Sequence, residues 1–227
     1  MKLEFLDSYS IRVRLSTSAI LFAPIAITTF LCFEEINTLA SSSVFIFVLL
    51  AFTNYIPILQ RYLYKDKFSR GNYAVQFLLP SDSTIDNVTK MRYYEKLSII
   101  DTSFNKLKNH NEKDEHQSCC ISAVSYLRSH TRDHHLIQEE NINYGFCKNL
   151  ITSKAIGIAI CILIIIFVSL FSWIKFKSFS AIPSNNYFSL LFSAFMLLFW
   201  LFGVKEKMLD DARKRYAKTL LSAIDLL

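Results

Sequence analysis

Four apolar blocks, each nearly long enough to cross a lipid bilayer as a helix, constrain this chain more than any other feature. They cover residues 16–33, 43–59, 155–176 and 187–204. A helix that crosses a hydrocarbon core of about 30 Å needs about 20 mainly apolar residues. Continuous apolar runs lack the alternation of a membrane β-barrel, so helices are the expected spanning form. We therefore predict an all-α membrane protein with four transmembrane helices in two hairpins.

Polar segments between these blocks divide the chain into four parts. We predict an N-terminal segment and first hairpin in 1–60, a helical insert in 61–154, a second hairpin in 155–204 and an amphipathic helix in 205–227. The chain has 227 residues, is 52% hydrophobic and contains only four Gly and four Pro. That composition is too apolar for several soluble domains.

The distribution of Lys and Arg predicts the orientation of the spans. Of the 25 basic residues, 23 lie before the first block, between the second and third blocks or after the fourth, and 14 of them lie in 61–154. Cytoplasmic loops of membrane proteins carry the excess of Lys and Arg. We therefore expect both termini and the insert in the cytoplasm. The net charge of +6 needs no nucleic-acid partner to explain it.

The insert shows helical spacing of its apolar residues. The sequence 83–86 (Ser-Thr-Ile-Asp) has the form of a capping box and predicts that a helix starts there. A second helix is expected over 112–130, with Cys120, Ala123, Val124 and Leu127 buried. A third starts near 131 or 133, and no strong breaker other than Gly145 separates it from the third apolar block. We expect this helix to run directly into the membrane.

The C-terminal segment 205–227 places apolar residues three and four apart beside several basic ones. The stripe consists of Leu209, Ala212, Tyr216, Leu220, Ala223 and Leu227. Three interpretations fit such a stripe: a coiled seam between subunits, a helix on the inner leaflet, or a helix packed on the insert.

The densest polar cluster lies at 128–135 and predicts an anion site. Guanidinium groups and histidines suit phosphate contacts. The candidate ligand-binding residues are Arg128, Arg132, His134 and Lys148. The alternative is a salt-bridged helix face that includes the acidic residues Asp133, Glu139 and Glu140.

Other chemistry is less well supported by the motifs. His130 and His134 have the i, i+4 spacing of zinc ligands, and His116 with Cys119 or Cys120 could complete such a site. However, no second pair stands at a recognised spacing. Arg128 and His134 are similar in spacing to the Arg and His of helical ribonucleases of the HEPN type. No Walker loop, GxGxxG, GxSxG or HExxH motif occurs, so we predict neither enzyme activity, nor a metal, nor a cofactor.

No charged residue lies deep in any apolar block, which argues against a proton relay or an ion-coupled transporter. The uncharged polar groups of the blocks are compatible with two roles. They could line a pore, or they could form hydrogen bonds between helices. The candidate pore and pore-mouth residues are Thr28, Thr29, Glu34, Glu35 and Asn54.

The plan of two hairpins around a helical insert, with the run 132–147 (RDHHLIQEENINYGFC) leading into a span, resembles small pore-forming effectors of bacterial antiphage systems. These are membrane partners encoded beside nucleotidyltransferases, such as the four-span proteins associated with SMODS enzymes and the channel component of Hailong defence. The resemblance implies a homo-oligomeric channel in the bacterial inner membrane. It also implies gating by the nucleotidyltransferase or by its nucleotide or oligonucleotide product.

The alternative is a non-conducting membrane scaffold or regulatory subunit that docks a cytoplasmic partner on the insert. Ion flux through purified protein in liposomes separates a channel from such a scaffold.

Overall fold

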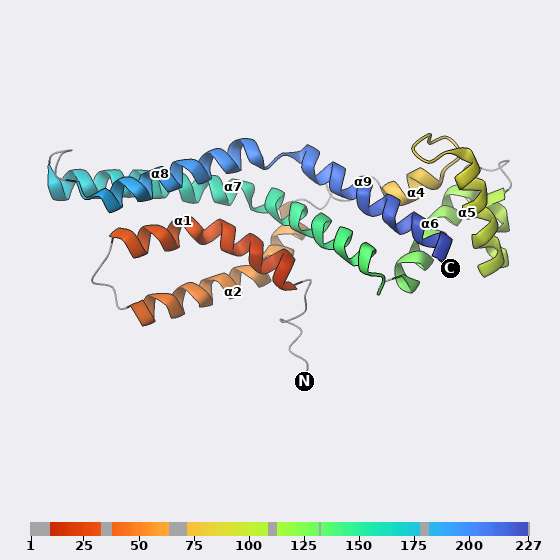
Figure 1. The fold of residues 1–227 in the computed structure, drawn as a ribbon, viewed down its shortest axis with the longest axis horizontal. Helices are drawn as coiled ribbons and strands as arrows, with labels where there is room; N and C mark the ends of the chain where they lie inside the picture. The colour runs from red at the N-terminus through yellow and green to blue at the C-terminus, as the bar shows by residue number, and fades with distance from the viewer. Residues whose placement is uncertain are drawn as a thin grey trace. The chain divides into compact units, whose positions relative to one another are not determined.

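A computed structural model describes residues 10–32, 38–63, 72–108, 113–131, 133–177 and 182–226. The described segments form helices and short connections, and none of them contains a β-strand, as the sequence predicted. The chain divides into two compact units (Figure 1). Unit 1 comprises Met1–Lys65 and Gly145–Met208, and unit 2 comprises Asp66–Tyr144 and Leu209–Leu227.

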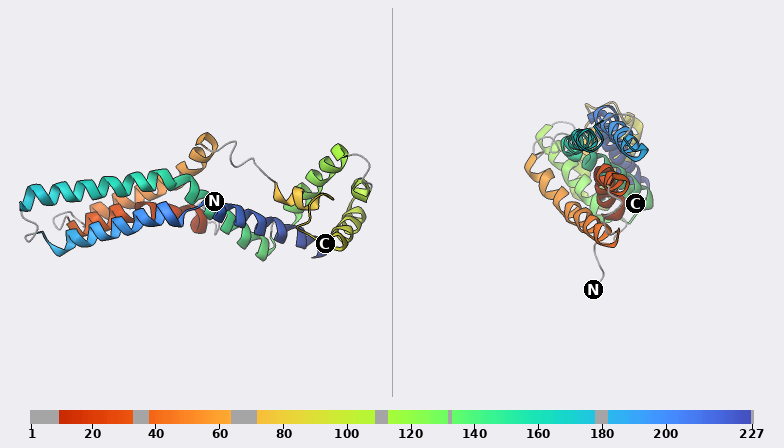
Figure 2. Two further views of the ribbon diagram at one scale, coloured as in Figure 1. Left: turned by 90° about the horizontal axis from the view of Figure 1, so that it is seen from above. Right: turned by 90° about the vertical axis from the view of Figure 1, so that its left-hand side faces the viewer.

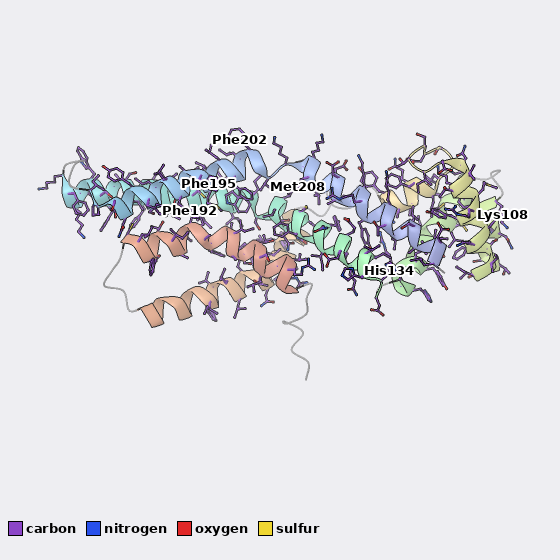
Figure 3. The ribbon with its side chains drawn as sticks, in the orientation of Figure 1. Lys108, His134, Phe192, Phe195, Phe202 and Met208 are labelled. Atoms are coloured by element: carbon purple, nitrogen blue, oxygen red, sulfur yellow. The ribbon has the colours of Figure 1, made fainter. Side chains whose placement is uncertain are left out.

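Unit 1 is a bundle of long apolar helices. Its elements are η2 (Ser10–Leu15), α1 (Ser16–Cys32), α2 (Thr38–Leu63), the larger part of α7 (His135–Phe176), α8 (Ser184–Leu198) and η5 (Phe199–Gly203). Figure 1 and Figure 2 agree that α1, α2, α7 and α8 run side by side, and α1 contacts both α2 and α8. Large apolar side chains cover the outside of the bundle. Phe202, labelled in Figure 3, has 65% of its surface exposed.

Three helical segments are long and apolar enough to cross a membrane: Arg12–Cys32, His135–Phe176 and Ser184–Gly203. These segments correspond to the predicted first, third and fourth spans, to within one residue at the ends of the first and fourth. The predicted second span lies in α2, whose recognised apolar stretch is the shorter Ile46–Gln60. The described residues therefore establish three membrane-length helices, and α2 as a fourth span is treated below as part of the proposed function.

Unit 2 is a small helical domain with an ordinary hydrophobic core. Its elements are α4 (Tyr73–Leu78), α5 (Asn87–Ile100), η3 (Thr102–Lys108), α6 (Lys113–His130), the first turns of α7, nearly all of α9 (Glu206–Ser222) and η6 (Ala223–Leu226). The predicted burial of one face of α6 is confirmed. Cys120, Ala123, Val124 and Leu127 are all buried.

The capping-box prediction was wrong about where the first helix of this unit begins. Helix α5 starts at Asn87, and Asp86 is its N-cap, with a carboxylate oxygen that accepts from Thr89 N at 2.8 Å. The preceding residues form a turn in which Thr84 N donates to Asp82 Oδ1 at 2.7 Å. Lys90 Nζ donates to the carbonyl oxygens of Leu79 (2.8 Å) and Asp82. These contacts hold the segment out of helical geometry, and local sequence does not reveal them.

The C-terminal helix α9 and the short η6 pack within unit 2. Ala217, Leu220, Leu221, Ala223 and Ile224 belong to the same buried cluster as the core residues of α4, α5 and α6. Of the three interpretations of the tail, the structure supports packing on the insert. The prediction that a helix continues into the third apolar block is also confirmed, because α7 is unbroken from His135 to Phe176.

Candidate functional site

A cleft of about 480 Å³ opens on unit 2 between α6, the first turns of α7 and α9. Its lining residues are Ser125, Arg128, Ser129, Ile137, Gln138, Asn141 and Tyr216. Ligand sites in proteins range over about 300–1,000 Å³ and combine apolar surface with a few polar groups. The size and lining of the cleft therefore fit a small polar ligand.

Arg128 is the cationic group of the cleft. It comes from the last turn of α6, and its Nη2 donates to Asn72 Oδ1 at 3.1 Å. Its guanidinium also lies beside the Tyr216 hydroxyl in the cleft. A guanidinium has five N–H donors in a planar fork that matches a carboxylate or phosphate. These two contacts orient the fork while leaving it donors for an anion.

Tyr216 supplies an aromatic face and a hydroxyl to the cleft. Its ring stacks on Tyr144 with centroids 6.2 Å apart, and the guanidinium of Arg213 lies 5.9 Å from the Tyr144 ring centre. Burial raises the pKa of the Tyr216 hydroxyl, and the nearby charge of Arg128 opposes that rise. At neutral pH the hydroxyl is therefore protonated and can act as a hydrogen-bond donor.

Two pairs of neutral polar side chains complete the lining. Gln138 and Asn141 are three residues apart on α7, and Ser125 and Ser129 are four apart on α6, spacings that place each pair on one helix face. Ser129 Oγ donates to the carbonyl oxygen of Tyr126 at 2.8 Å. Amides and hydroxyls both donate and accept hydrogen bonds, so this lining suits a ligand with a mixed polar edge beside one anionic group.

The structure places the four predicted anion-site residues in different surroundings. Arg128 lies in the cleft, and Arg132 is outside the described residues. His134 directly precedes α7, and its Nδ1 is buried without a hydrogen-bond partner among the described residues. Lys148 lies on the part of α7 that belongs to unit 1. It follows His134 by about four helical turns, or about 20 Å along the helix. The cleft thus contains one of the four, and a joint site for all four stays a prediction.

The sequence did not predict the remaining cleft residues as site residues, although it placed Tyr216 in the apolar stripe of the tail. Gln138 and Asn141 flank an apolar helix face, which is a usable signal only once the helix boundaries are known. Tyr216 is remote in sequence from Arg128, and only tertiary packing brings the two together. Of the acidic residues suggested for a salt-bridged helix face, Glu140 forms an ion pair with α9. Its Oε2 lies 3.6 Å from Arg215 Nε.

The predicted pore residues occupy the helix contacts and surface of unit 1. Thr28 Oγ1 and Ser189 Oγ form a buried hydrogen bond of 2.6 Å between α1 and α8. Thr29 is half-buried, and Asn54 is exposed on α2 with its Nδ2 donating to Leu50 O at 3.1 Å. Glu34 and Glu35 lie outside the described residues. Thr28 therefore has the helix-to-helix role that the sequence left open, whereas Asn54 faces outward.

Two further polar contacts repeat the Thr28 arrangement. Ser18 Oγ and Thr53 Oγ1 lie 3.1 Å apart between α1 and α2, and Asn186 Nδ2 donates to Ser172 Oγ at 2.7 Å between α8 and α7. Apolar lipid gives little driving force for helix association, so such bonds and close packing hold helices together in membranes.

The histidines of the suggested zinc site do not gather. His130 stacks on Tyr126 with ring centroids 3.9 Å apart, and its Nδ1 lies 3.0 Å from the Tyr126 carbonyl oxygen. Within the described segments, no group of three His, Cys, Asp or Glu side chains has a geometry that could hold a metal ion.

No family model matches the chain, and no curated protein or solved structure matches it.

Proposed function

We propose that this protein is a homo-oligomeric, pore-forming membrane effector whose cytoplasmic unit 2 binds an anionic, nucleotide-type signal. One observation carries the proposal. Helix α7 bears the cleft residues Ile137, Gln138 and Asn141 near its start and continues without a break as a membrane-length apolar segment. A ligand in the cleft therefore touches the same continuous helix that, in this proposal, crosses the bilayer.

The cleft supplies the binding free energy that gating needs. A phosphate bound by Arg128 makes charge-assisted hydrogen bonds, which are about twice as strong as neutral ones. Such a ligand also bridges α6, α7 and α9, and it shifts a closed-to-open equilibrium by the difference between its affinities for the two states. The resemblance to antiphage effectors supports a nucleotide or oligonucleotide, or a nucleotidyltransferase, as the source of the signal.

Asn54 supports assembly from several subunits. It is exposed on α2, whereas Thr28 and Thr53 are buried in contacts between helices. A polar side chain within an apolar span is favoured where it faces another helix or a water-filled path. Several copies that present Asn54 to one another or to a central path satisfy this requirement.

The proposed topology has four spans, with α2 as the second, in the bacterial inner membrane. Its test is a set of reporter fusions. Fusions after Asn109 and after Leu227, both outside the described residues, should report the cytoplasm, and a fusion at Pro183 should report the outside. An external signal at Asn109 would overturn this topology, because 14 basic residues in 61–154 favour retention in the cytoplasm.

Potassium efflux from proteoliposomes tests the pore itself, with cyclic di-adenosine monophosphate and ATP as soluble probes. We expect a probe to change the efflux of the wild type, and Arg128→Glu, alone or with Arg132→Glu, to abolish that response. The matched control is Lys108→Glu, an equal charge change at an exposed residue of unit 2 outside the cleft (Figure 3). Expression level and oligomer size are compared first. A response that persists in the Arg128 variants would remove the cleft from the mechanism.

A non-conducting scaffold is the second candidate, and the buried hydroxyl pairs favour it. Thr28 with Ser189 and Ser18 with Thr53 are used in contacts between helices, so they do not line a water path within one subunit. Absence of efflux with every probe, in protein of confirmed oligomer size, supports the scaffold and contradicts the channel.

A further inference from the structure

One end of unit 1 is marked by polar contacts that join its segments. Asn149 Nδ2 on α7 donates to the Val13 carbonyl oxygen of η2 at 3.2 Å, and Gln60 Nε2 on α2 donates to Asn149 Oδ1. Lys154, about 8 Å further along α7, donates from Nζ to the Val204 carbonyl oxygen at 2.7 Å, directly after η5. These bonds place η2, α2, α7 and the end of η5 in one narrow band, which we call the Asn149 level.

The Asn149 level is strongly basic. Among the described residues of unit 1, Glu206 is the sole carboxylate. The basic residues in or beside the level are Arg12, Arg14, Lys148, Lys154, Lys205 and Lys207. Lys205 and Lys207 are exposed and Arg14 is half-buried, whereas Lys154 is already engaged with backbone carbonyl groups. The level therefore presents an excess of positive charge at the end of an apolar bundle.

The length of α7 relates this level to the bilayer. Lys175 and Lys177, the basic pair at the other end of the helix, begin 26 residues after Asn149, which corresponds to about 39 Å along the axis. Between these levels α7 exposes Leu163, Phe167 and other large apolar side chains. A bilayer measures about 40–45 Å including its headgroup regions. With the apolar segment in the hydrocarbon, the Asn149 level lies among headgroups.

We propose that Arg14, Lys205 and Lys207 bind the phosphate groups of anionic phospholipids at the Asn149 level. The charge of the level is complementary to such headgroups, and basic residues beside a span are attracted to an anionic leaflet. This inference rests on the membrane placement within the proposed function. It does not depend on a pore or on a ligand in the cleft.

Lipid binding to the purified full-length protein tests the inference. Native mass spectrometry in a neutral detergent compares phosphatidylglycerol with phosphatidylcholine of identical acyl chains. We expect preferential retention of phosphatidylglycerol by the wild type. In Lys205→Gln with Lys207→Gln its affinity should fall about 25-fold, since each basic residue near an anionic surface contributes about a fivefold factor. Arg14→Gln should weaken binding further. The matched control is Lys175→Gln with Lys177→Gln. It should lose much less affinity, because the Lys175 ammonium already lies over the rings of Phe171 and Phe176, 5.4 and 5.5 Å from their centroids.

Three outcomes would overturn the proposal: equal retention of the two lipids, equal loss in the two double variants, or displacement of phosphatidylglycerol by inorganic phosphate. The last result would assign the level to a soluble anion. Unfolding temperatures in phosphatidylcholine alone are compared first, because unchanged temperatures show that a lost affinity is not lost folding. Efflux plays no part in this experiment, so a protein that conducts no ions can still confirm the lipid site.

Discussion

The two units of this chain place polar and apolar side chains in opposite ways. In unit 2, Leu97, Leu127 and Leu220 are fully buried, and charged residues such as Arg92 lie at the surface. In unit 1, Phe30 and Ile174 are exposed, and hydroxyl and amide groups are buried between helices. Burial of apolar surface stabilises a domain in water, whereas packing and interhelical hydrogen bonds stabilise helices in lipid. The same sequence thus contains folding patterns suited to two solvents.

Removing leucine side chains should give the largest difference between the units. Leu220→Ala deletes a side chain with no exposed surface in the core of unit 2, and we expect a loss of about 2–5 kcal/mol in its free energy of unfolding. Leu191→Ala removes a side chain that is 70% exposed on α8, and we expect little change in stability. Urea unfolding in a mild detergent, followed by hydrogen exchange of each unit, measures both effects. Equal losses would show that Leu191 is buried in the assembled protein.

The burial of Leu220 also changes how assembly should be tested. An Asp at this position tests a seam between subunits only if the side chain faces a second copy. In the structure Leu220 packs within its own chain, so Leu220→Asp would destabilise unit 2 whether or not the protein assembles. Substitutions at Asn54, which is exposed, are the better probe of subunit contacts.

A close contact in unit 1 should give the next largest effect. A Cβ atom added at Gly157 on α7 would lie within 2.6 Å of Trp200 Cδ2, and Trp200 is fully buried. We expect Gly157→Ala to lower the stability of unit 1 by about 1–3 kcal/mol through overpacking. Gly203→Ala is the control, because its Cβ would come no closer than 3.1 Å to a side-chain atom of Phe199.

Thermal unfolding in detergent measures the Gly157 effect, and a second substitution identifies its cause. Gly157→Ala combined with Trp200→Leu should recover part of the stability lost by Gly157→Ala, because the smaller side chain makes room for the methyl group. An equal loss in the Gly157 and Gly203 variants would show that helix propensity or flexibility, and not the contact with Trp200, decides the result.

Much of the fold could be predicted because backbone groups in lipid must form their own hydrogen bonds. That requirement turns long apolar blocks into helices, and three of the four predicted spans appear as membrane-length helices. The continuity of α7 followed from the scarcity of breakers before it enters the bundle. The start of α5 was missed because Ser83 and Asp86 are both good N-cap residues, and the contacts of Lys90 with the preceding turn decide between them.

The cleft was less predictable than the helices. Arg128 stood out as a basic residue at a helix end, but Gln138, Asn141 and Tyr216 become neighbours of Arg128 only through the packing of α6, α7 and α9. A single sequence gives helical periodicity along each element and no information about which helix faces which. The hydroxyl pairs show the same limit, because the sequence named Thr28 but not Ser189 as its partner.

Loss of an interhelical hydrogen bond should have a smaller effect than the steric change at Gly157. Thr28→Val keeps the shape of the side chain and removes the hydroxyl that bonds Ser189. Interhelical hydrogen bonds in membranes contribute about 0.6 kcal/mol on average, so we expect a destabilisation of that size. Thr29→Val, at the neighbouring half-buried position, is the control, and thermal unfolding in detergent compares the two. A greater effect at Thr29 would place Thr29, and not Thr28, at an important polar contact.

The smallest expected effect is a pH dependence that belongs to unit 2 alone. Asp210 on α9 accepts a hydrogen bond from Lys214 Nζ at 2.7 Å and another from the Tyr73 hydroxyl of α4. The bond from Lys214, followed by the bond from Tyr73, lowers the pKa of Asp210 below its ordinary value of about 4. The ionised carboxylate therefore stabilises the folded state above that value, and this contribution is lost as the pH falls through the lower pKa of the folded state.

Tyr73, the other hydrogen-bond partner of Asp210, predicts a second loss of folding stability at high pH. The hydrogen bond to Asp210 raises the pKa of Tyr73 above its ordinary value of about 10, so its contribution is present below that pH and is lost as the pH rises through the folded-state pKa. The stability difference between the wild type and Asp210→Asn should therefore be greatest between about pH 5 and pH 9 and should shrink on both sides. Asp211→Asn, next to it on α9, is the control. Urea unfolding from pH 2.5 to pH 11 measures both differences. A difference for Asp210→Asn that stays constant across this range would show that the Asp210 contacts with Tyr73 and Lys214 do not persist in solution.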